Sequence, residues 1–108
     1  MKLFLDDLRS PPPGDWAVVR SVAEAVALVE VRGMPSFVSF DHDLGLEADG
    51  SIAPSGHDFA KWLVEEDLSG RRLPCDFDFV VHSANPVGRL NIEGLLRSYL
   101  LQRNGDSR

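Results

Sequence analysis

The chain has 108 residues, of which 44% are hydrophobic and 26% are charged, a balance typical of globular domains. No run approaches the ~20 apolar residues of a membrane span, and Cys75 is the only cysteine, which excludes an internal disulfide and a cysteine-based zinc site. A net charge of −6 argues against an extended nucleic-acid footprint, because such a footprint requires several lysine or arginine contacts with phosphates.

The first part of the chain combines short apolar runs with turn-forming residues. Residues 1–5 predict a strand, and the acid pair Asp6 and Asp7 follows it directly. The prolines at 11–13 exclude a helix or strand interior and predict a stiff, extended crossover. A short second strand is expected over residues 16–20.

The next two elements have clear boundaries. Ser21-Val22-Ala23-Glu24 is a capping box that opens a helix, and Gly33 ends that helix. Residues 37–40 form an apolar run bounded by Pro35 and Gly45, which is typical of a strand buried on both faces in a parallel sheet.

The second half of the chain predicts a loop, a helix, a strand and a final helix. Residues 44–55 are expected to be a solvated loop, since their acids do not match the spacing of a calcium-binding loop. A second capping box at Ser55 opens a helix that ends near Gly70. Residues 76–81 predict the last strand, and residues 85–104 predict the last helix, with a proline in or just ahead of its first turn.

This alternation of strands and helices predicts an α/β fold, namely a layered sandwich around a small, mainly parallel sheet of four strands. Numbered along the chain, the strands are expected in the spatial order 2-1-3-4. Residues 1–104 are expected to form one domain, and residues 105–108 a disordered tail.

Carboxylates follow the first and the central strand, at the edge where open parallel sheets bind ligands: Asp6, Asp7, Asp41 and Asp43. Two carboxylates ~4 Å apart repel each other by roughly 4 kcal/mol at the effective dielectric of a protein surface. Protonation or a bound cation must offset that repulsion. Magnesium, manganese or calcium suits oxygen ligands, and Asp6, Asp7 and Asp41 are the candidate ligands. Alternatively, these acids only form turns or cap helices.

Two histidines also follow strands at this edge. His42 and His82 could serve as general base and general acid on a phosphodiester, with Asp41 and Asp43 as catalytic partners. Either imidazole could instead bind a metal, with a neighbouring acid fixing its tautomer. A purely structural histidine is the remaining alternative.

A third group of residues has the chemistry of a phosphate site. Ser83, Asn85 and Arg89 surround the start of the last helix, where backbone amides and a guanidinium favour an anion. Arg9, just after the first acid pair, could reach the same anion, and Arg20 could approach from the adjacent strand. Helix capping is the alternative role for Ser83 and Asn85.

The order of these residues resembles the receiver domains of two-component signalling. The acid pair Asp6-Asp7, the strand-end Asp41 and the dipeptide Ser83-Ala84 match that pattern. The resemblance implies a three-layer, flavodoxin-like sandwich, with the acid pair holding magnesium and Asp41 accepting a phosphoryl group. The chain departs from receivers because it has no fifth strand and no lysine at the end of one; its only lysines are Lys2 and Lys61.

A closer resemblance is to the cyclic-phosphate processing receiver domains, a receiver-like family. The motifs that carry it span nearly the whole chain: Phe4-Leu5-Asp6-Asp7-Leu8-Arg9, Pro11-Pro12, Val19-Arg20, Asp41-His42-Asp43-Leu44-Gly45, Gly56-His57-Asp58 and His82 to Asn91. The resemblance implies a receiver-like fold, truncated relative to a full receiver, and an enzyme that acts on cyclic phosphates, including those at RNA ends that await repair.

The leading hypothesis is therefore a phosphoesterase that opens a cyclic phosphate, on a 2′,3′-cyclic nucleotide or an RNA terminus. His42, His82, Asp41 and Asp43 are the predicted catalytic residues, and a divalent cation, Mg²⁺ or Mn²⁺, is the expected cofactor. The alternatives are a receiver phosphorylated on Asp41 and a non-catalytic module that binds a nucleotide, a cation or a protein. No signal-peptide layout is present, so we expect a cytoplasmic protein without a membrane partner.

Overall fold

A computed structural model describes residues 1–105, which contain four strands and three helices. The strands are β1 (Lys2–Leu5), β2 (Ala17–Val19), β3 (Phe37–Phe40) and β4 (Asp78–Val81). The helices are α1 (Val22–Arg32), α2 (Gly56–Leu68) and α3 (Pro86–Gly105). Of the tail predicted at 105–108, Gly105 is the last residue of α3, and residues 106–108 lie outside the described part of the chain.

The four strands form one parallel sheet in the order β2-β1-β3-β4, which confirms the predicted strand order. Leu5 pairs with Phe40, and Phe40 pairs with Val81, so the carboxyl ends of β1, β3 and β4 are level. The ladder continues one residue further, because the amide of Asp41 donates to the carbonyl of Leu5 (2.9 Å) and the amide of His82 donates to that of Phe40 (2.9 Å). The polar residues that follow these strands therefore lie side by side.

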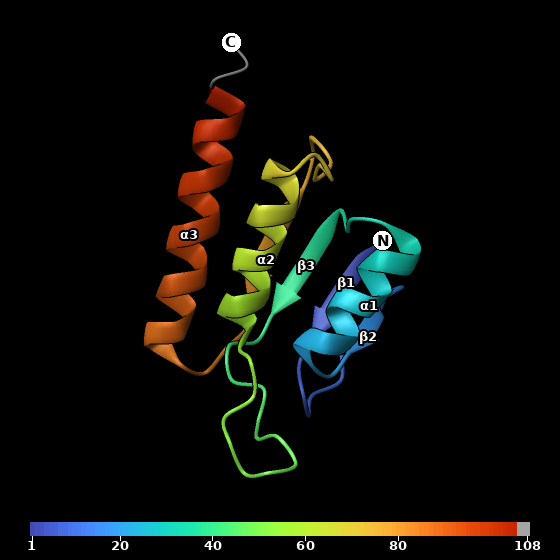
Figure 1. Cartoon of the computed structure of the whole chain (residues 1–108), viewed down its shortest axis with the longest axis vertical. Helices are drawn as coiled ribbons and strands as arrows, with labels where there is room; N and C mark the ends of the chain where they lie inside the picture. Colours follow the sequence, from blue (N-terminus) through green and yellow to red (C-terminus); the bar gives the residue numbers. More distant parts are fainter. Residues whose placement is uncertain (106–108) are drawn as a thin grey trace.

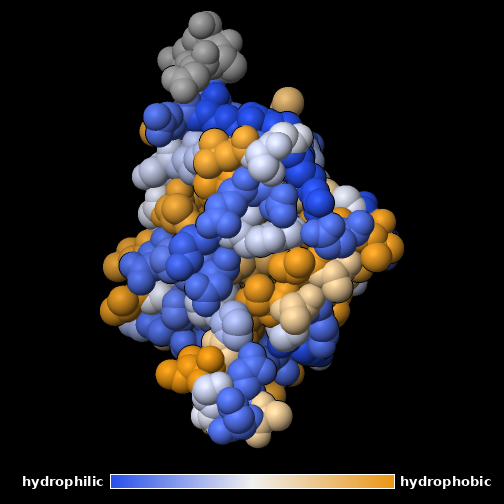
Figure 2. Space-filling view, viewed as in Figure 1, coloured by the Kyte–Doolittle hydropathy of each residue, from blue (hydrophilic) through white to orange (hydrophobic). Residues whose placement is uncertain are grey.

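The hydrophobic core fills the space between the sheet and the helices, and the three helices lie on the same side of the sheet (Figure 1). Alternate residues of each strand point into this core, as the two-residue period of a strand requires. The buried cluster includes Leu3, Leu5, Val38, Phe40, Phe79 and Val81 of the sheet with Ala25, Val29, Phe59, Leu63, Ile92 and Leu96 of the helices. Hydrophilic residues cover much of the outer side of the helical layer (Figure 2).

The opposite face of the sheet is covered differently from the predicted three-layer arrangement. The receiver-like α/β class is confirmed, but no described helix lies on this face. The β1–β2 connection takes the place of that layer, because Trp16 packs edge-on against Phe4 and Phe37 at 5.9 Å between ring centroids. The physical reason is the proline run, which is too short and too stiff to form a crossover helix.

Capping residues place the starts of α1 and α2. Ser21 accepts from the amide of Glu24 (3.1 Å), but the Glu24 carboxylate accepts from Arg20 (3.0 Å), so only half of the first predicted capping box forms. The second box is complete, since Ser55 and Asp58 each accept from the other's amide. None of the described helices has the length and apolar character needed to cross a membrane.

Candidate functional site

A pocket of about 400 Å³ lies beyond the carboxyl ends of β1, β3 and β4. The four predicted carboxylates line it together with Arg9, Ser83 and Asn85. The surface therefore has a pocket at the edge of the sheet where the sequence pattern predicted the polar residues to gather. Its lining is strongly acidic, with four aspartates against one arginine.

Asp6 is the most buried residue of the pocket, with 1% of its surface exposed. One carboxylate oxygen accepts from the amides of Leu8 (2.9 Å) and Arg9 (2.8 Å), and the other lies 2.9 Å from His82 Nε2. Burial alone would raise the pKa of Asp6, but the Arg9 and Leu8 amides and His82 outweigh it and hold that pKa below its ordinary value. The fold therefore keeps an ionised carboxylate at this buried position.

Three neighbours fix the His82 imidazole. Nε2 faces Asp6, Nδ1 lies 2.7 Å from the hydroxyl of Ser39, and the ring stacks on Phe4 at 4.7 Å with an interplanar angle of 4°. Stacking on Phe4 fixes the orientation of the ring plane, and the hydrogen bonds at both nitrogens fix the direction in which each nitrogen points. Ser39 was not among the predicted site residues.

Asp41 directly follows β3 and lines the pocket near Asp6. Its carboxylate accepts from the amide of His42 (2.8 Å), and burial together with the negative charge of Asp6 raises its pKa. Gly56, at the start of α2, lies directly against the Asp41 carbonyl, because a Cβ on Gly56 would come within 1.8 Å of that oxygen.

One set of side chains in the described residues has the geometry of a metal site. One ligand atom each from Asp6, Asp41 and His82 lies within 4.8 Å of the others. Two carboxylates and an imidazole suit Mn²⁺, Mg²⁺ or Zn²⁺, so these residues fit a divalent cation. The predicted ligand Asp7 lines the pocket but does not belong to this set, and His82 stands in its place.

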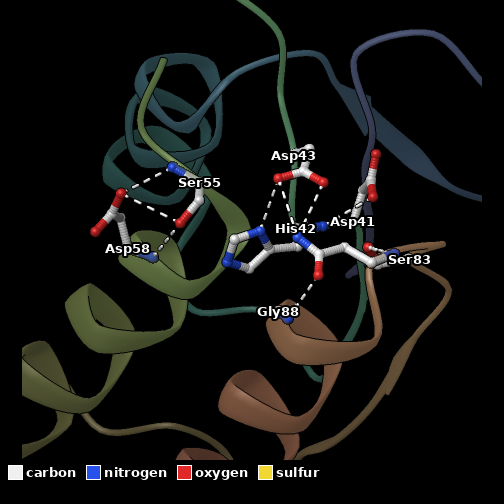
Figure 3. Close-up of polar contacts among 8 residues, drawn as sticks. Asp41, His42, Asp43, Ser55, Asp58, Ser83 and Gly88 are labelled. Carbon is white, nitrogen blue, oxygen red and sulfur yellow. Dashed lines mark hydrogen bonds and ion pairs between the residues drawn. The ribbon is translucent and has the colours of Figure 1, made fainter. Parts of the chain in front are cut away.

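The second histidine belongs to a different network, drawn in Figure 3. His42 Nδ1 lies 2.9 Å from one carboxylate oxygen of Asp43, and the other oxygen accepts from the side-chain amide of Asn85 (3.2 Å). Asn85 in turn caps α3 by accepting from the amide of Gly88 (3.0 Å). The hydrogen bond from His42 is the main cause that lowers the pKa of Asp43.

The two imidazoles belong to separate hydrogen-bonded pairs. Among residues 1–105 they share no hydrogen bond, and each is paired with its own carboxylate, Asp6 or Asp43. The reason is the alternation of side chains across a sheet. His82 is the first residue after its strand and His42 the second after its own, so the two rings leave the edge on different sides.

Of the three arginines that were candidates for binding phosphate, one lines the pocket and two make contacts elsewhere. Arg9 lines the pocket and donates to the carbonyl of His82 (3.1 Å). Arg20 instead braces the loop after β1, by donating to the carbonyls of Asp6 (3.0 Å) and Arg9. Arg89, predicted to bind phosphate, points along α3 to Glu93 (3.5 Å) and does not line the pocket.

Two of the phosphate candidates also have the capping role that the sequence left open. Ser83 accepts from the amide of Asn85 (3.1 Å), and its side chain partly offsets the rise in the pKa of Asp41 that burial and Asp6 cause. Both residues still line the pocket. Capping and a place at the pocket are therefore combined in the same side chains.

A signal for the missed residue was present in the chain. Ser39 is the only polar residue in the Phe-Val-Ser-Phe strand, and a hydroxyl buried among apolar residues needs a partner. The identity of that partner was not readable, because His82 lies 43 positions away along the chain.

Comparison with known proteins identifies the family of this chain. A family model described as the cyclic-phosphate processing receiver domain matches residues 1–98. No curated protein and no solved structure matches the chain. The matched segment contains all four strands and each residue that lines the pocket. The chain therefore belongs to the cyclic-phosphate processing receiver domain family.

Proposed function

We propose that this domain hydrolyses a cyclic phosphodiester, on a 2′,3′-cyclic nucleotide or on an RNA end that carries a 2′,3′-cyclic phosphate. The observation that carries the proposal is the convergence of Asp6, Asp41 and His82 within 4.8 Å beside a pocket that also holds Arg9 and Ser83. The family's link with cyclic phosphates supplies the substrate class.

The charge of the pocket indicates how a phosphate could enter it. Four carboxylates against one guanidinium would repel an anion, by roughly 4 kcal/mol for each close pair at an effective dielectric of 20. A divalent cation held by Asp6, Asp41 and His82 would reverse the sign of that interaction. When bound, such a cation polarises a phosphoryl oxygen and lowers the pKa of a bound water.

The chain's own hydrogen-bond donors also line this pocket. The Arg9 guanidinium offers charge-assisted hydrogen bonds to phosphate oxygens. Ser83 adds a hydroxyl, and the amino end of α3 contributes a favourable dipole. Asn85 holds Asp43 and Gly88, so we assign it the role of ordering this side of the pocket.

Asp43 and His42 are the proposed proton-transfer pair. Asp43 lines the pocket and receives a hydrogen bond from His42, which can stabilise or share a proton there. In the reaction, a water oxygen adds to phosphorus and one P–O bond of the ring breaks. The proton lost by the water ends on the released ribose oxygen, which leaves a phosphomonoester.

The test is hydrolysis of 2′,3′-cyclic AMP with Mg²⁺ or Mn²⁺, followed by ³¹P NMR. We expect turnover by the wild-type chain and a loss of about 100-fold or more in Asp41→Asn and His82→Ala, the range found when a positioned catalytic group is removed. Asp76→Asn, an exposed carboxylate away from the pocket, is the matched control and should retain full activity.

Other outcomes would favour the alternative functions. Stable labelling by acetyl phosphate, lost in Asp41→Asn and without turnover of cyclic phosphates, would contradict hydrolysis and indicate a phosphoacceptor. Tight binding of 2′,3′-cyclic AMP without product would indicate a binding module.

A further inference from the structure

Ser39 is a buried polar residue that the proposed reaction does not use directly. It lies in the middle of the sheet, pairs with Phe4 of β1 and Val80 of β4, and has 5% of its surface exposed. Its hydroxyl lies 2.7 Å from His82 Nδ1. His82 follows Val80 by two residues and therefore leaves the sheet on the same side. The hydroxyl is thus behind the imidazole, on the side away from Asp6.

The group that faces Nε2 of His82 decides which of the two ring nitrogens carries the proton. A neutral imidazole carries one N–H, which can be on either nitrogen. While Nε2 faces the ionised Asp6 carboxylate at 2.9 Å, the proton belongs on Nε2, and Nδ1 must accept from the Ser39 hydroxyl. If Nε2 binds a cation instead, the proton must move to Nδ1, and Ser39 must accept.

A hydroxyl group can serve both states, since it has one donor and two acceptor positions. An apolar residue at position 39 could serve neither. Phe4 stacks on the ring and prevents it from turning toward another partner. In the cation-bound state a buried Nδ1–H without an acceptor would carry a desolvation penalty.

We propose that Ser39 is a positioning residue whose hydroxyl lets His82 change tautomer, so that Nε2 donates to Asp6 without a cation and binds a divalent cation when one is present. This inference rests on the cation site of the proposed function and adds the group that makes His82 a competent ligand. Ser39 acts only through His82, because it does not line the pocket beyond the strand ends.

The first test is calorimetric titration of the metal-free chain with Mn²⁺. We expect Ser39→Ala to weaken Mn²⁺ binding by about 10-fold, the lower end of the range for a lost hydrogen bond behind a metal-bound histidine. Ser39→Thr retains a hydroxyl and should bind within about threefold of wild type, less than the loss of the hydrogen bond itself causes. Ser36→Ala is the matched control, because that serine is in the same segment but bonds the carbonyl of Met1.

The second test reads the tautomer itself and separates positioning from folding. ¹⁵N NMR of His82 above pH 8 should find the proton on Nε2 in the metal-free chain, and on Nδ1 after Zn²⁺, a diamagnetic substitute, is added. In Ser39→Ala the proton should stay on Nε2 without metal, and the signature of a hydrogen-bonded Nδ1 should be lost.

Several results would overturn the inference: equal Mn²⁺ affinity of Ser39→Ala and wild type, no Mn²⁺ binding by wild type, or a metal-free proton on Nδ1. The proposed hydrolysis is judged separately. A chain whose Mn²⁺ affinity depends on the Ser39 hydroxyl but which opens no cyclic phosphate would refute the reaction and leave the role of Ser39 standing.

Discussion

Gly88, in the first turn of α3, lies directly against the His42 ring. A Cβ on this residue would lie 2.3 Å from Cγ of His42 and 2.7 Å from its Nδ1, the atom that bonds Asp43. The absence of a side chain therefore lets His42 lie between α3 and the loop after β3. Inside a helix, glycine is ordinarily less stable than alanine by about 1 kcal/mol. At position 88 the space that His42 needs gives a structural reason for glycine.

Gly88→Ala should consequently destabilise the fold, although helix propensity alone would make alanine the more stable residue at this position. We expect the free energy of unfolding to fall by about 1–3 kcal/mol, as for other overpacked sites, and the His42 ring resonances to shift. Gly94→Ala, in the same helix with nothing within 4 Å of the added Cβ, should instead stabilise the chain by about 1 kcal/mol. Urea denaturation of both variants checks this. Equal effects of the two substitutions would show that His42 is not confined.

The same scale shows which parts of the site the sequence could predict. Residues that directly follow β1, β3 and β4, such as Asp6 and Asp41, were predictable, because the strand register alone brings them together. The partners of His42 and His82 were not, since they depend on which side of the sheet edge each ring leaves. The prediction that Arg89 lies at the phosphate site failed for a related reason. Its position around the axis of α3 directs its side chain to Glu93 and not into the pocket.

At the scale of elements, the start of α2 links a local sequence motif to the site. Ser55 and Asp58 form a reciprocal cap, with the Ser55 amide 2.8 Å from the Asp58 carboxylate. The next residue, Gly56, donates its amide to the carbonyl of His42 (2.9 Å) and packs against Asp41. The cap, drawn in Figure 3, therefore holds the helix start against the backbone of the strand-end residue Asp41.

Asp58→Ala should lower the free energy of unfolding by about 1 kcal/mol, the typical contribution of a cap. Glu65→Ala removes the same charge from an exposed position in the same helix and should change stability by less than about 0.5 kcal/mol. Thermal or urea unfolding of the two variants measures the difference. A loss of the same size in both would assign the effect to charge and not to the cap.

The elements themselves were largely predictable, because apolar runs mark the strands, capping residues open α1 and α2, and glycines follow the ends of these helices. The strand order followed from parallel pairing and short connections. The absence of a second helical layer among the described residues is less visible in a sequence, since it depends on what Trp16 covers. That residue packs on the open face of the sheet against Phe4 and Phe37.

For the whole molecule, a buried carboxylate at the far end of the sheet joins α2, α3 and the segment before β4. Asp67 is fully buried and accepts from the Leu73 amide (2.7 Å), from Arg103 (2.9 Å) and from the Tyr99 hydroxyl. Sequence pattern did not single it out, because its partners on α3 are more than 30 positions away. Removing one member of such a buried group leaves the others unpaired.

This cluster should give the fold a defined dependence on acid. Burial alone would raise the pKa of Asp67, but the hydrogen bonds from Tyr99 and Leu73 and the charge of Arg103 outweigh it and lower that pKa. A lowered pKa in the folded state means that the unfolded chain binds the proton more readily. The stabilisation by Asp67 is therefore fully present above the ordinary aspartate pKa of about 3.9 and is lost as the pH falls through the folded value.

Asp67→Asn tests the sign of this effect. At pH 7 the substitution should lower the free energy of unfolding by about 3 kcal/mol, the cost of breaking a buried ion pair. The difference from wild type should shrink as the pH is lowered toward 3, because the wild-type carboxylate then becomes protonated and loses the same interactions. Asp76→Asn, at an exposed position, should be nearly neutral at either pH. A difference between wild type and Asp67→Asn that stayed constant from pH 7 to pH 3 would mean that shape, and not the charge of Asp67, joins the two helices to the sheet.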